Sequence, residues 1–175
     1  MAPMPMRIRT WGDPVLRQPG AEISEVDDAL LKLVDDMLET MYAAPGVGLA
    51  AQQVGVLLRL FVYDVGEGPG VFLNPEIVET GGEWEYEEGC LSVPGLYFPI
   101  TRPETVHITG TDLDGNTVEI EGHDLLGRVF LHETDHLEGH LLLDRLEPRI
   151  RKQAMRILRE RALDPTAVGP PHAHG

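Results

Sequence analysis

The chain has 175 residues, and 14 lysines and arginines against 29 aspartates and glutamates give it a formal net charge of −15. This acidity argues against a general DNA- or RNA-binding protein, because binding to phosphates requires an excess of positive charge. With 42% hydrophobic residues, the chain can bury one core of ordinary domain size. The single cysteine, Cys90, excludes an internal disulfide, so the fold does not depend on an oxidising compartment.

The sequence shows neither a membrane-spanning segment nor a secretory signal. No apolar run approaches the roughly 18 residues that cross a bilayer, and the first ten residues contain no secretory signal. We therefore expect a soluble, cytoplasmic protein with no membrane contact. Residues 1–164 are expected to form one domain, and residues 165–175, rich in Pro, Gly and Ala, a flexible tail.

The first predicted element is a helix over residues 25–43, where apolar side chains recur every three or four positions. Ser24 is its expected N-cap, and Pro45 follows its end. Short apolar stretches bounded by turn residues come next, and they predict strands over residues 57–65, 70–78, 82–87, 105–112 and 117–121.

The second half of the chain predicts a hairpin and two helices. Asp114-Gly115-Asn116 is typical of a tight turn between the last two strands. Helices are predicted over residues 124–138 and 148–163. A helix, several antiparallel strands and further helices together predict an α+β fold.

The most informative motif is His132-Glu133-Thr134-Asp135-His136, an HExxH pattern within a predicted helix. Two histidines four residues apart stand on one helix face, where both imidazoles can bind one metal ion. Glu133 then lies beside the metal, within reach of a water molecule to be activated.

The helix pattern gives a second argument for metal binding. Leu125 and Val129 share the helix row of His132 and His136, so the imidazoles should face the interior. Buried histidines without partners are costly, whereas a metal satisfies them. The alternative is two packed or solvated histidines on an ordinary helix.

A catalytic site with one open position needs a third protein ligand. One candidate is Cys90, within Glu88-Gly89-Cys90-Leu91-Ser92, although a lone cysteine is also a common small buried residue. The downstream candidates are either close in sequence to the motif or within the tail: Glu138, His140, Asp144, His172 and His174.

A third feature is the segment GVGLAAQQ, which runs from Gly46 to Gln53. Its glycines would allow a ligand to approach the backbone closely, and Gln53 could donate a hydrogen bond to a developing oxyanion. The alternative is an ordinary glycine-rich loop after a helix.

Together, GVGLAAQQ, EGCLS and HETDH, in this order, closely resemble the three motifs of peptide deformylase, and the resemblance runs from Ile8 to about Leu163. It implies antiparallel strands around a central metal-binding helix, with an N-terminal and a C-terminal helix. It also implies a hydrolase that removes the formyl group from the N-terminal formylmethionine of new proteins in a bacterial-type cytoplasm. Residues 1–164 would then be the catalytic domain.

The resemblance assigns roles to individual residues. Cys90, His132 and His136 would hold one divalent ion, Fe²⁺ natively, with Zn²⁺, Ni²⁺ or Co²⁺ as substitutes. Glu133 would be the general acid and base, with two oxyanion donors, the side chain of Gln53 and the backbone N–H of Leu91. The substrate-binding residues would be Gly46, Val47, Gly48, Tyr86, Gly89, Leu125 and Val129.

Further expectations concern charged residues near the site. Glu88 could accept a hydrogen bond from a ligating histidine, and Asp135 could pair with Arg102, as the resemblance suggests. Two positions depart from patterns common in the family, Tyr97 and Arg128. For Arg128 we expect a stem that covers apolar surface and a head exposed at the pocket rim.

Seven basic and two acidic residues give the segment 145–161 a net charge of +5, which leaves −20 on the rest of the chain. In the bacterial family the C-terminal helix is linked to docking at the ribosome, and the resemblance suggests the same contact here. The alternative is a solvated helix whose arginines pair with the chain's own acids.

Two other functions remain open at this point. A metallopeptidase would share the HExxH chemistry but needs a downstream third ligand. A non-catalytic metal-binding or ribosome-associated protein would not need Gln53 or Glu133.

Overall fold

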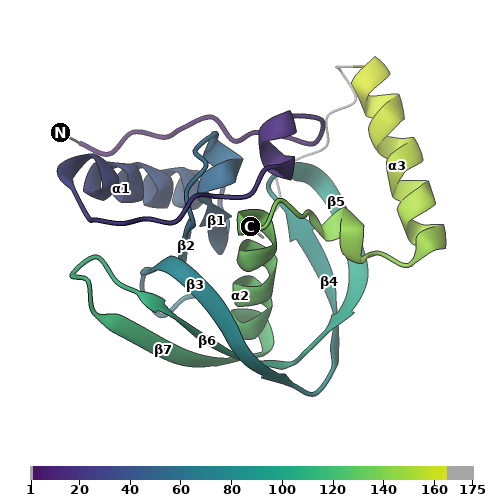
Figure 1. The fold of residues 1–175 in the computed structure, drawn as a ribbon. Coiled ribbons are helices and arrows are strands. Elements are labelled where there is room, and N and C mark those ends of the chain that lie inside the picture. The colour runs from purple at the N-terminus through teal and green to yellow at the C-terminus, as the bar shows by residue number, and fades with distance from the viewer. Residues whose placement is uncertain (1, 165–175) are drawn as a thin grey trace.

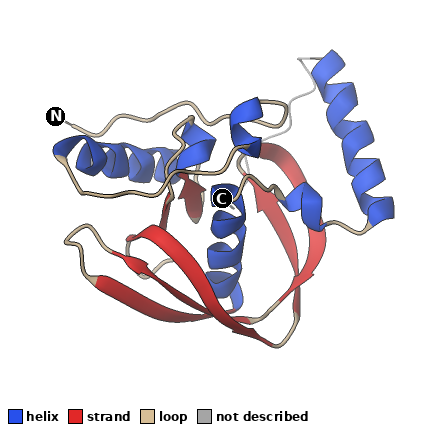
Figure 2. Ribbon diagram, in the orientation of Figure 1, coloured by secondary structure: helices blue, strands red, loops and turns tan. Residues whose placement is uncertain are grey.

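The computed structural model of the protein describes residues 2–164. Helix α2 (Asp124–Leu137) stands at the centre, with strands around it (Figure 1). Helix α1 (Asp28–Ala43) lies on one side, and helix α3 (Pro148–Leu163) stands at the opposite edge of the molecule (Figure 2). The predicted α+β class, with strands around a central helix and a helix toward each end of the chain, is confirmed.

The strands form two antiparallel sheets. The five-stranded sheet has the order β1-β2-β3-β6-β7, and β4 pairs with β5 in a separate hairpin. The bounds of the strands are β1 Gly48–Ala50, β2 Leu60–Tyr63, β3 Gly70–Gly81, β4 Trp84–Cys90, β5 Val93–Arg102, β6 Thr105–Thr111 and β7 Thr117–His123. Short 3-10 helices are η1 Pro14–Arg17, η2 Ala51–Val54 and η3 Leu142–Arg145.

The prediction of Ser24 as the N-cap of α1 is wrong. The cap is Asp27, whose carboxylate accepts a hydrogen bond from the backbone N–H of Leu30 at 2.9 Å. The segment before it is held extended, because the Asn74 side chain bonds both the N–H and the carbonyl of Ile23, each at 2.8 Å. The helix therefore begins after this anchor.

Strand β5 was not among the predicted strands. It contains Pro94, Gly95 and Pro99, residues that weaken a strand pattern. It pairs only with β4, so these prolines cost no ladder bond on its outer side. The pairing also extends β4 beyond the expected residue 87, as far as Cys90. Cys90 is thereby carried by a strand end.

Three clusters of buried apolar side chains form the core. One joins α1 to β1 and β2, a second joins α2 to β3 and β6, and a third joins the β4–β5 hairpin to α3. Leu91 belongs to the first cluster and Cys90 to the third. The turn that carries these two residues is therefore fixed between separate parts of the core.

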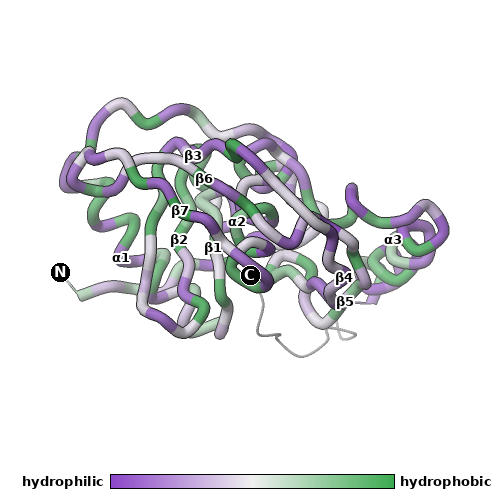
Figure 3. Tube along the Cα trace, turned by 90° about the horizontal axis from the view of Figure 1, so that it is seen from below, coloured by the Kyte–Doolittle hydropathy of each residue, from purple (hydrophilic) through white to green (hydrophobic). Residues whose placement is uncertain are grey.

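In Figure 3, α3 stands at the edge of the molecule beside β4 and β5, and much of it is coloured hydrophilic. Within residues 2–164, none of the helices combines the length and the apolar character needed to cross a membrane. The predicted tail, residues 165–175, lies outside the described residues.

Candidate active site

Helix α2 and the end of β4 bring three potential metal ligands together. His132 and His136 lie one turn apart on α2, are 5% and 1% exposed, and have their Nε2 atoms 3.2 Å from each other. Cys90 is fully buried, and its Sγ atom lies 3.4 Å from Nε2 of His136. The three ligand atoms lie within 4.8 Å of one another.

The other third-ligand candidates do not join this group. Glu138 pairs with Arg59, and Asp144 pairs with Arg17. His140 has an exposed side chain beside Asp144. His172 and His174 lie outside the described residues. Within the part of the chain that the structure describes, Cys90 is thus the residue that completes the histidine pair.

The three donors fit a divalent transition metal. A tetrahedral ion with metal–nitrogen bonds of about 2.0–2.1 Å and a metal–sulfur bond of about 2.3 Å separates its donors by roughly 3.3–3.6 Å. The separations of 3.2 and 3.4 Å between Nε2 atoms and Sγ are close to these values. One sulfur and two imidazole nitrogens suit iron, cobalt, nickel and zinc, and three protein ligands leave one position open.

Charge and burial split the pKa values of the two histidines. Burial opposes protonation of His132, but the neighbouring Cys90 and Glu133 raise its pKa well above the ordinary value. Burial and the nearby charge of His132 lower the pKa of His136 well below that value. The site therefore does not hold two protonated imidazoles side by side.

Glu133 lies buried opposite β1. Neither of its carboxylate oxygens has a hydrogen-bond partner among the described residues. Burial raises its pKa to about 7. A buried carboxylate without a partner is costly unless a ligand or an ion uses it. These properties suit a group that takes up and gives back a proton near neutral pH.

The metal-free protein is expected to lose stability as the pH rises, because of Glu133. Its folded pKa of about 7 lies above the ordinary 4.5, so this contribution is present below pH 4.5 and is lost as the pH passes 7. Between pH 5 and 8 the loss amounts to about 2–3 kcal/mol. Glutamine at position 133 cannot titrate. The free energy of unfolding in urea should therefore fall less between pH 5 and pH 8 for Glu133→Gln than for the wild type. An equal difference at both pH values would contradict this.

Gly48 gives Glu133 its room. A Cβ atom at Gly48 would lie 2.6 Å from Oε2 and 3.0 Å from Cδ of Glu133. Such distances are too short for any side chain, so β1 must have glycine here for the carboxylate to keep its place.

Gly48→Ala should therefore lower kcat by about 10–100-fold, because the displaced carboxylate no longer faces its target correctly. The measurement is turnover at saturating substrate and saturating metal. Gly81→Ala is the control, since its Cβ would meet only Oγ1 of Thr105, at 3.0 Å. A normal kcat for Gly48→Ala would refute the displacement.

Gln53 points its amide toward the turn after β4. Its Oε1 accepts a hydrogen bond from the N–H of Ala50 at 2.9 Å, which fixes the side chain. Its Nε2 donates to Oγ of Ser92 at 3.1 Å and lies 3.7 Å from Sγ of Cys90. Leu91 lies in the same buried turn. The structure thus gathers Gln53 and Leu91 beside the ligand group.

A buried carboxylate orients His132. Nδ1 of His132 lies 2.7 Å from Oε2 of Glu88, which directs Nε2 toward Cys90 and His136. Arg102 grips the same carboxylate with Nε on Oε1 at 3.0 Å and Nη2 on Oε2 at 2.8 Å. Although burial favours the neutral acid, His132 and Arg102 hold the pKa of Glu88 well below its ordinary value.

The chain of charges continues to the surface. Arg102 Nη1 donates to Oδ2 of Asp135 at 2.7 Å, and Arg145 binds both oxygens of Asp135. The expected Asp135–Arg102 pair is therefore present. Burial alone would raise the pKa of Asp135, but the two arginines lower it below its ordinary value.

A narrow cavity of about 10 Å³ opens beside His132. Most of the predicted substrate-binding residues line it. The other two, Gly46 and Gly48, lie beside Leu91 and Glu133. The cavity is lined by Val47, Tyr86, Glu88, Gly89, Leu125, Arg128, Val129 and His132.

The expectation that Arg128 exposes its head is wrong. The side chain is only 2% exposed. Its guanidinium lies among acceptors, the carboxylate of Glu88 and the main-chain carbonyls of Trp84 and Ile100. These partners compensate the buried charge, so the head need not reach water.

Comparison with known proteins agrees with this geometry. The sequence model of the polypeptide deformylase family matches residues 5–152. The chain belongs to the polypeptide deformylase family. A peptide deformylase of Clostridium botulinum is 53% identical over 138 residues, 79% of this chain and 94% of that protein. One from Acidothermus cellulolyticus is 49% identical over 87% of this chain and 85% of its own length.

Solved deformylase structures share the fold. The crystal structure of a peptide deformylase from Legionella pneumophila superposes with a TM-score of 0.86 at 42% identity. It covers 93% of this chain and 98% of its own. The strands around α2 are thus arranged as in a deformylase.

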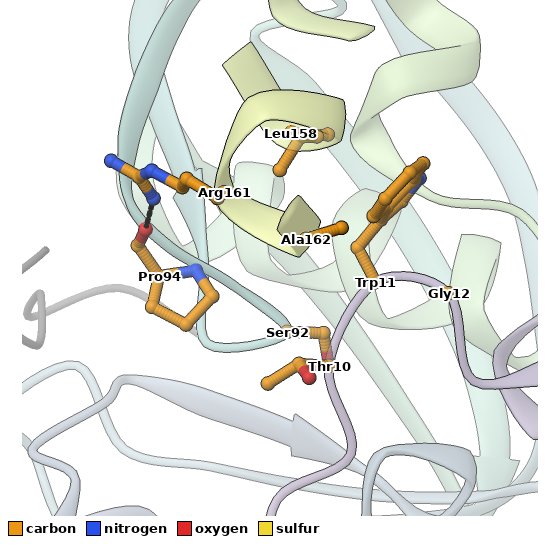
Figure 4. A pocket seen from close by; sticks show the side chains of 8 residues that line it. All are labelled: Thr10, Trp11, Gly12, Ser92, Pro94, Leu158, Arg161 and Ala162. Atoms are coloured by element: carbon orange, nitrogen blue, oxygen red, sulfur yellow. Dashed lines mark hydrogen bonds between the residues drawn. The ribbon is translucent and has the colours of Figure 1, made fainter. Parts of the chain in front are cut away.

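A second cavity lies beside the turn after β4. It measures about 300 Å³ and is bounded by the segment around Trp11, the turn after β4 and the last turns of α3 (Figure 4). Arg161 donates to the carbonyl of Pro94 at its edge, at 2.6 Å. Ser92 lines this cavity and also accepts a hydrogen bond from Gln53, so it connects the cavity wall to the side chain of Gln53.

Sequence reasoning missed the parts played by Ser92 and Arg128. Ser92 stood next to Cys90 in the quoted motif, and this position was the only available signal. For Arg128 the signal was its spacing of four residues from His132, which places both on one face of α2.

Proposed function

We propose that this protein removes the formyl group from the N-terminal formylmethionine of newly made polypeptides and releases formate. The proposal rests chiefly on one observation, the convergence of Cys90, His132 and His136 beside the unpartnered carboxylate of Glu133. It also rests on membership of the polypeptide deformylase family. In this proposal, residues 1–164 form the catalytic domain.

Cys90, His132 and His136 would hold one divalent ion per chain. When bound, the ion would supply a Lewis acid for the formyl oxygen and lower the pKa of the attacking water. We propose Fe²⁺ as the native ion, with Zn²⁺, Ni²⁺ or Co²⁺ as substitutes. The mixed thiolate and imidazole donors support this set of metals.

Glu133 accepts the proton of the attacking water and later gives a proton to the leaving amine. The attack forms a carbon–oxygen bond at the formyl carbon, and collapse of the tetrahedral adduct breaks the carbon–nitrogen bond. Gln53 Nε2 and the N–H of Leu91 donate to the oxygen that becomes negative. Formate and a free amino terminus are the products.

The narrow cavity beside His132 would have to widen to receive the methionine side chain, because about 10 Å³ holds little more than one water-sized probe. Apolar surface from Val47, Tyr86, Leu125 and Val129 supports this assignment. The backbone near Gly46, Gly48 and Gly89 would pair with the extended peptide as an added strand.

The exposed face of α3 is proposed to contact the ribosome, in the bacterial cytoplasm where new chains are made. Arg156 and Arg159 have exposed side chains on this helix. Because RNA binding depends on phosphate neutralisation, charge reversal of both should lower co-sedimentation with ribosomes at low salt. Hydrolysis of a formylated dipeptide should be unaffected. Arg7→Glu, at an exposed position outside α3, is the control, and unchanged co-sedimentation of the double variant would refute the contact.

Formate release from formyl-Met-Ala-Ser tests the activity. The protein should be purified without oxygen and its metal content measured, because a thiolate-bound ferrous ion is sensitive to oxidation. Stoichiometric formate and an intact peptide chain support deformylation. Cleavage of internal peptide bonds would favour a metallopeptidase, and a filled site without any turnover would favour a non-catalytic metal protein.

A further inference from the structure

Arg128 occupies a position that the proposed chemistry does not yet use. It is among the largest fully buried side chains, and it lies one helical turn before His132. Burying a guanidinium costs several kcal/mol unless its donors are satisfied. Its contacts therefore indicate what it holds in place.

The guanidinium of Arg128 ties α2 to both strands of the β4–β5 hairpin. Nη1 donates to Oε1 of Glu88 and to the carbonyl of Ile100, each at 3.0 Å. Nη2 donates to the carbonyl of Trp84. The group also lies over the rings of Trp84 and Tyr86, 5.5 and 5.8 Å from their centroids. Each of these contacts restricts the head to one orientation.

Glu88 receives donors from three side chains at once. Arg128 and Arg102 share Oε1, while Arg102 and His132 share Oε2. Each carboxylate oxygen thus accepts hydrogen bonds from two side chains, so the carboxylate cannot rotate without breaking charge-assisted hydrogen bonds. Nδ1 of His132 is fixed by this carboxylate, so the direction of Nε2 depends on it.

The two arginines connect Glu88 to different parts of the molecule. Arg102 joins Glu88 to Asp135 and so to the surface residue Arg145. Arg128 joins Glu88 to the hairpin backbone and lines the narrow cavity with Leu125 and Val129. The second connection therefore joins the hairpin backbone and this cavity wall to the carboxylate that orients a ligand histidine.

We propose that Arg128 is a positioning residue that orients His132 through Glu88 and so sets the geometry of the Cys90–His132–His136 group. This inference rests on the proposed function, which makes Cys90, His132 and His136 the metal ligands. Arg128 does not touch the reacting atoms, and its effect passes through the shared carboxylate.

The test replaces Arg128 by methionine, which keeps a long apolar stem and removes the donors. Co²⁺ affinity, measured by chelator competition, should fall about 10–100-fold, as is typical when the partner of a metal ligand is lost. The visible absorption bands of the Co²⁺ form should also change. Arg59→Met is the matched control, because Arg59 likewise donates to a carboxylate and a carbonyl, those of Glu138 and Pro75.

Thermal unfolding of the metal-free variants separates positioning from general stability. Should Arg128→Met fail to fold, Arg128→Lys serves instead, since it keeps the charge but loses the planar fork. A weaker Co²⁺ affinity and an altered spectrum in the folded variant support the proposal. Wild-type affinity and spectrum overturn it. Because these readouts need no turnover, a wild-type protein that released no formate would refute the deformylase proposal and leave this test intact.

Discussion

Replacing Glu133 by glutamine is expected to lower kcat for a formylated peptide by about 10²–10⁴-fold. The carboxylate is fully buried, has no hydrogen-bond partner among the described residues and has a pKa raised by burial to about 7. Glutamine has nearly the same shape but cannot accept the proton. The rate should be measured at saturating substrate and with the bound metal quantified.

Metal content distinguishes this effect from loss of the site. Glu133→Gln should retain the ion, because the carboxylate is not one of the three converging donors. Glu87→Gln, an exposed neighbour of Glu88 on β4, should leave both kcat and metal content unchanged. If Glu133→Gln turned over at the rate of the wild type, another group would have to be the base.

Replacing Cys90 by serine is expected to remove most of the bound metal and with it the activity. A serine hydroxyl stays protonated at neutral pH and is a poor ligand compared with a thiolate. Affinity should fall by more than about 100-fold, since loss of an outer partner alone typically costs 10–100-fold. Chelator competition with Co²⁺ measures this, and the sulfur-to-cobalt charge-transfer absorption should disappear.

Folding provides the control for the cysteine variant. Cys90 packs in the cluster that joins the β4–β5 hairpin to α3. Serine at this position should cost some stability in the metal-free protein, which urea unfolding quantifies separately. A folded Cys90→Ser variant that bound Co²⁺ as tightly as the wild type would exclude the thiolate as a ligand.

Local patterns in the sequence predicted the helices well. Helix α3 has the predicted bounds, because Pro148 fits the first helical turn and the apolar period continues to the end. Helix α2 carries His132 and His136 on one buried face, as their spacing of four residues predicted. Such features depend on neighbours within one or two turns.

Features that depend on distant partners could not be predicted in this way. Strand β5 forms despite its prolines because β4 pairs with it. The choice between Cys90 as a ligand and as a packed apolar residue stayed open, since only the fold brings β4 against α2. Arg128 stays buried because carbonyls from two strands accept its protons. The sequence near Arg128 does not indicate that these carbonyls would lie beside it.

We propose that one metal ion, held beside Glu133, makes this chain a deformylase. The most direct test titrates metal-free protein with Fe²⁺ under anaerobic conditions while formate release from formyl-Met-Ala-Ser is recorded. We expect the rate to rise in proportion to the added metal and to level off at one ion per chain. A protein with one tightly bound ion and no formate release would contradict it.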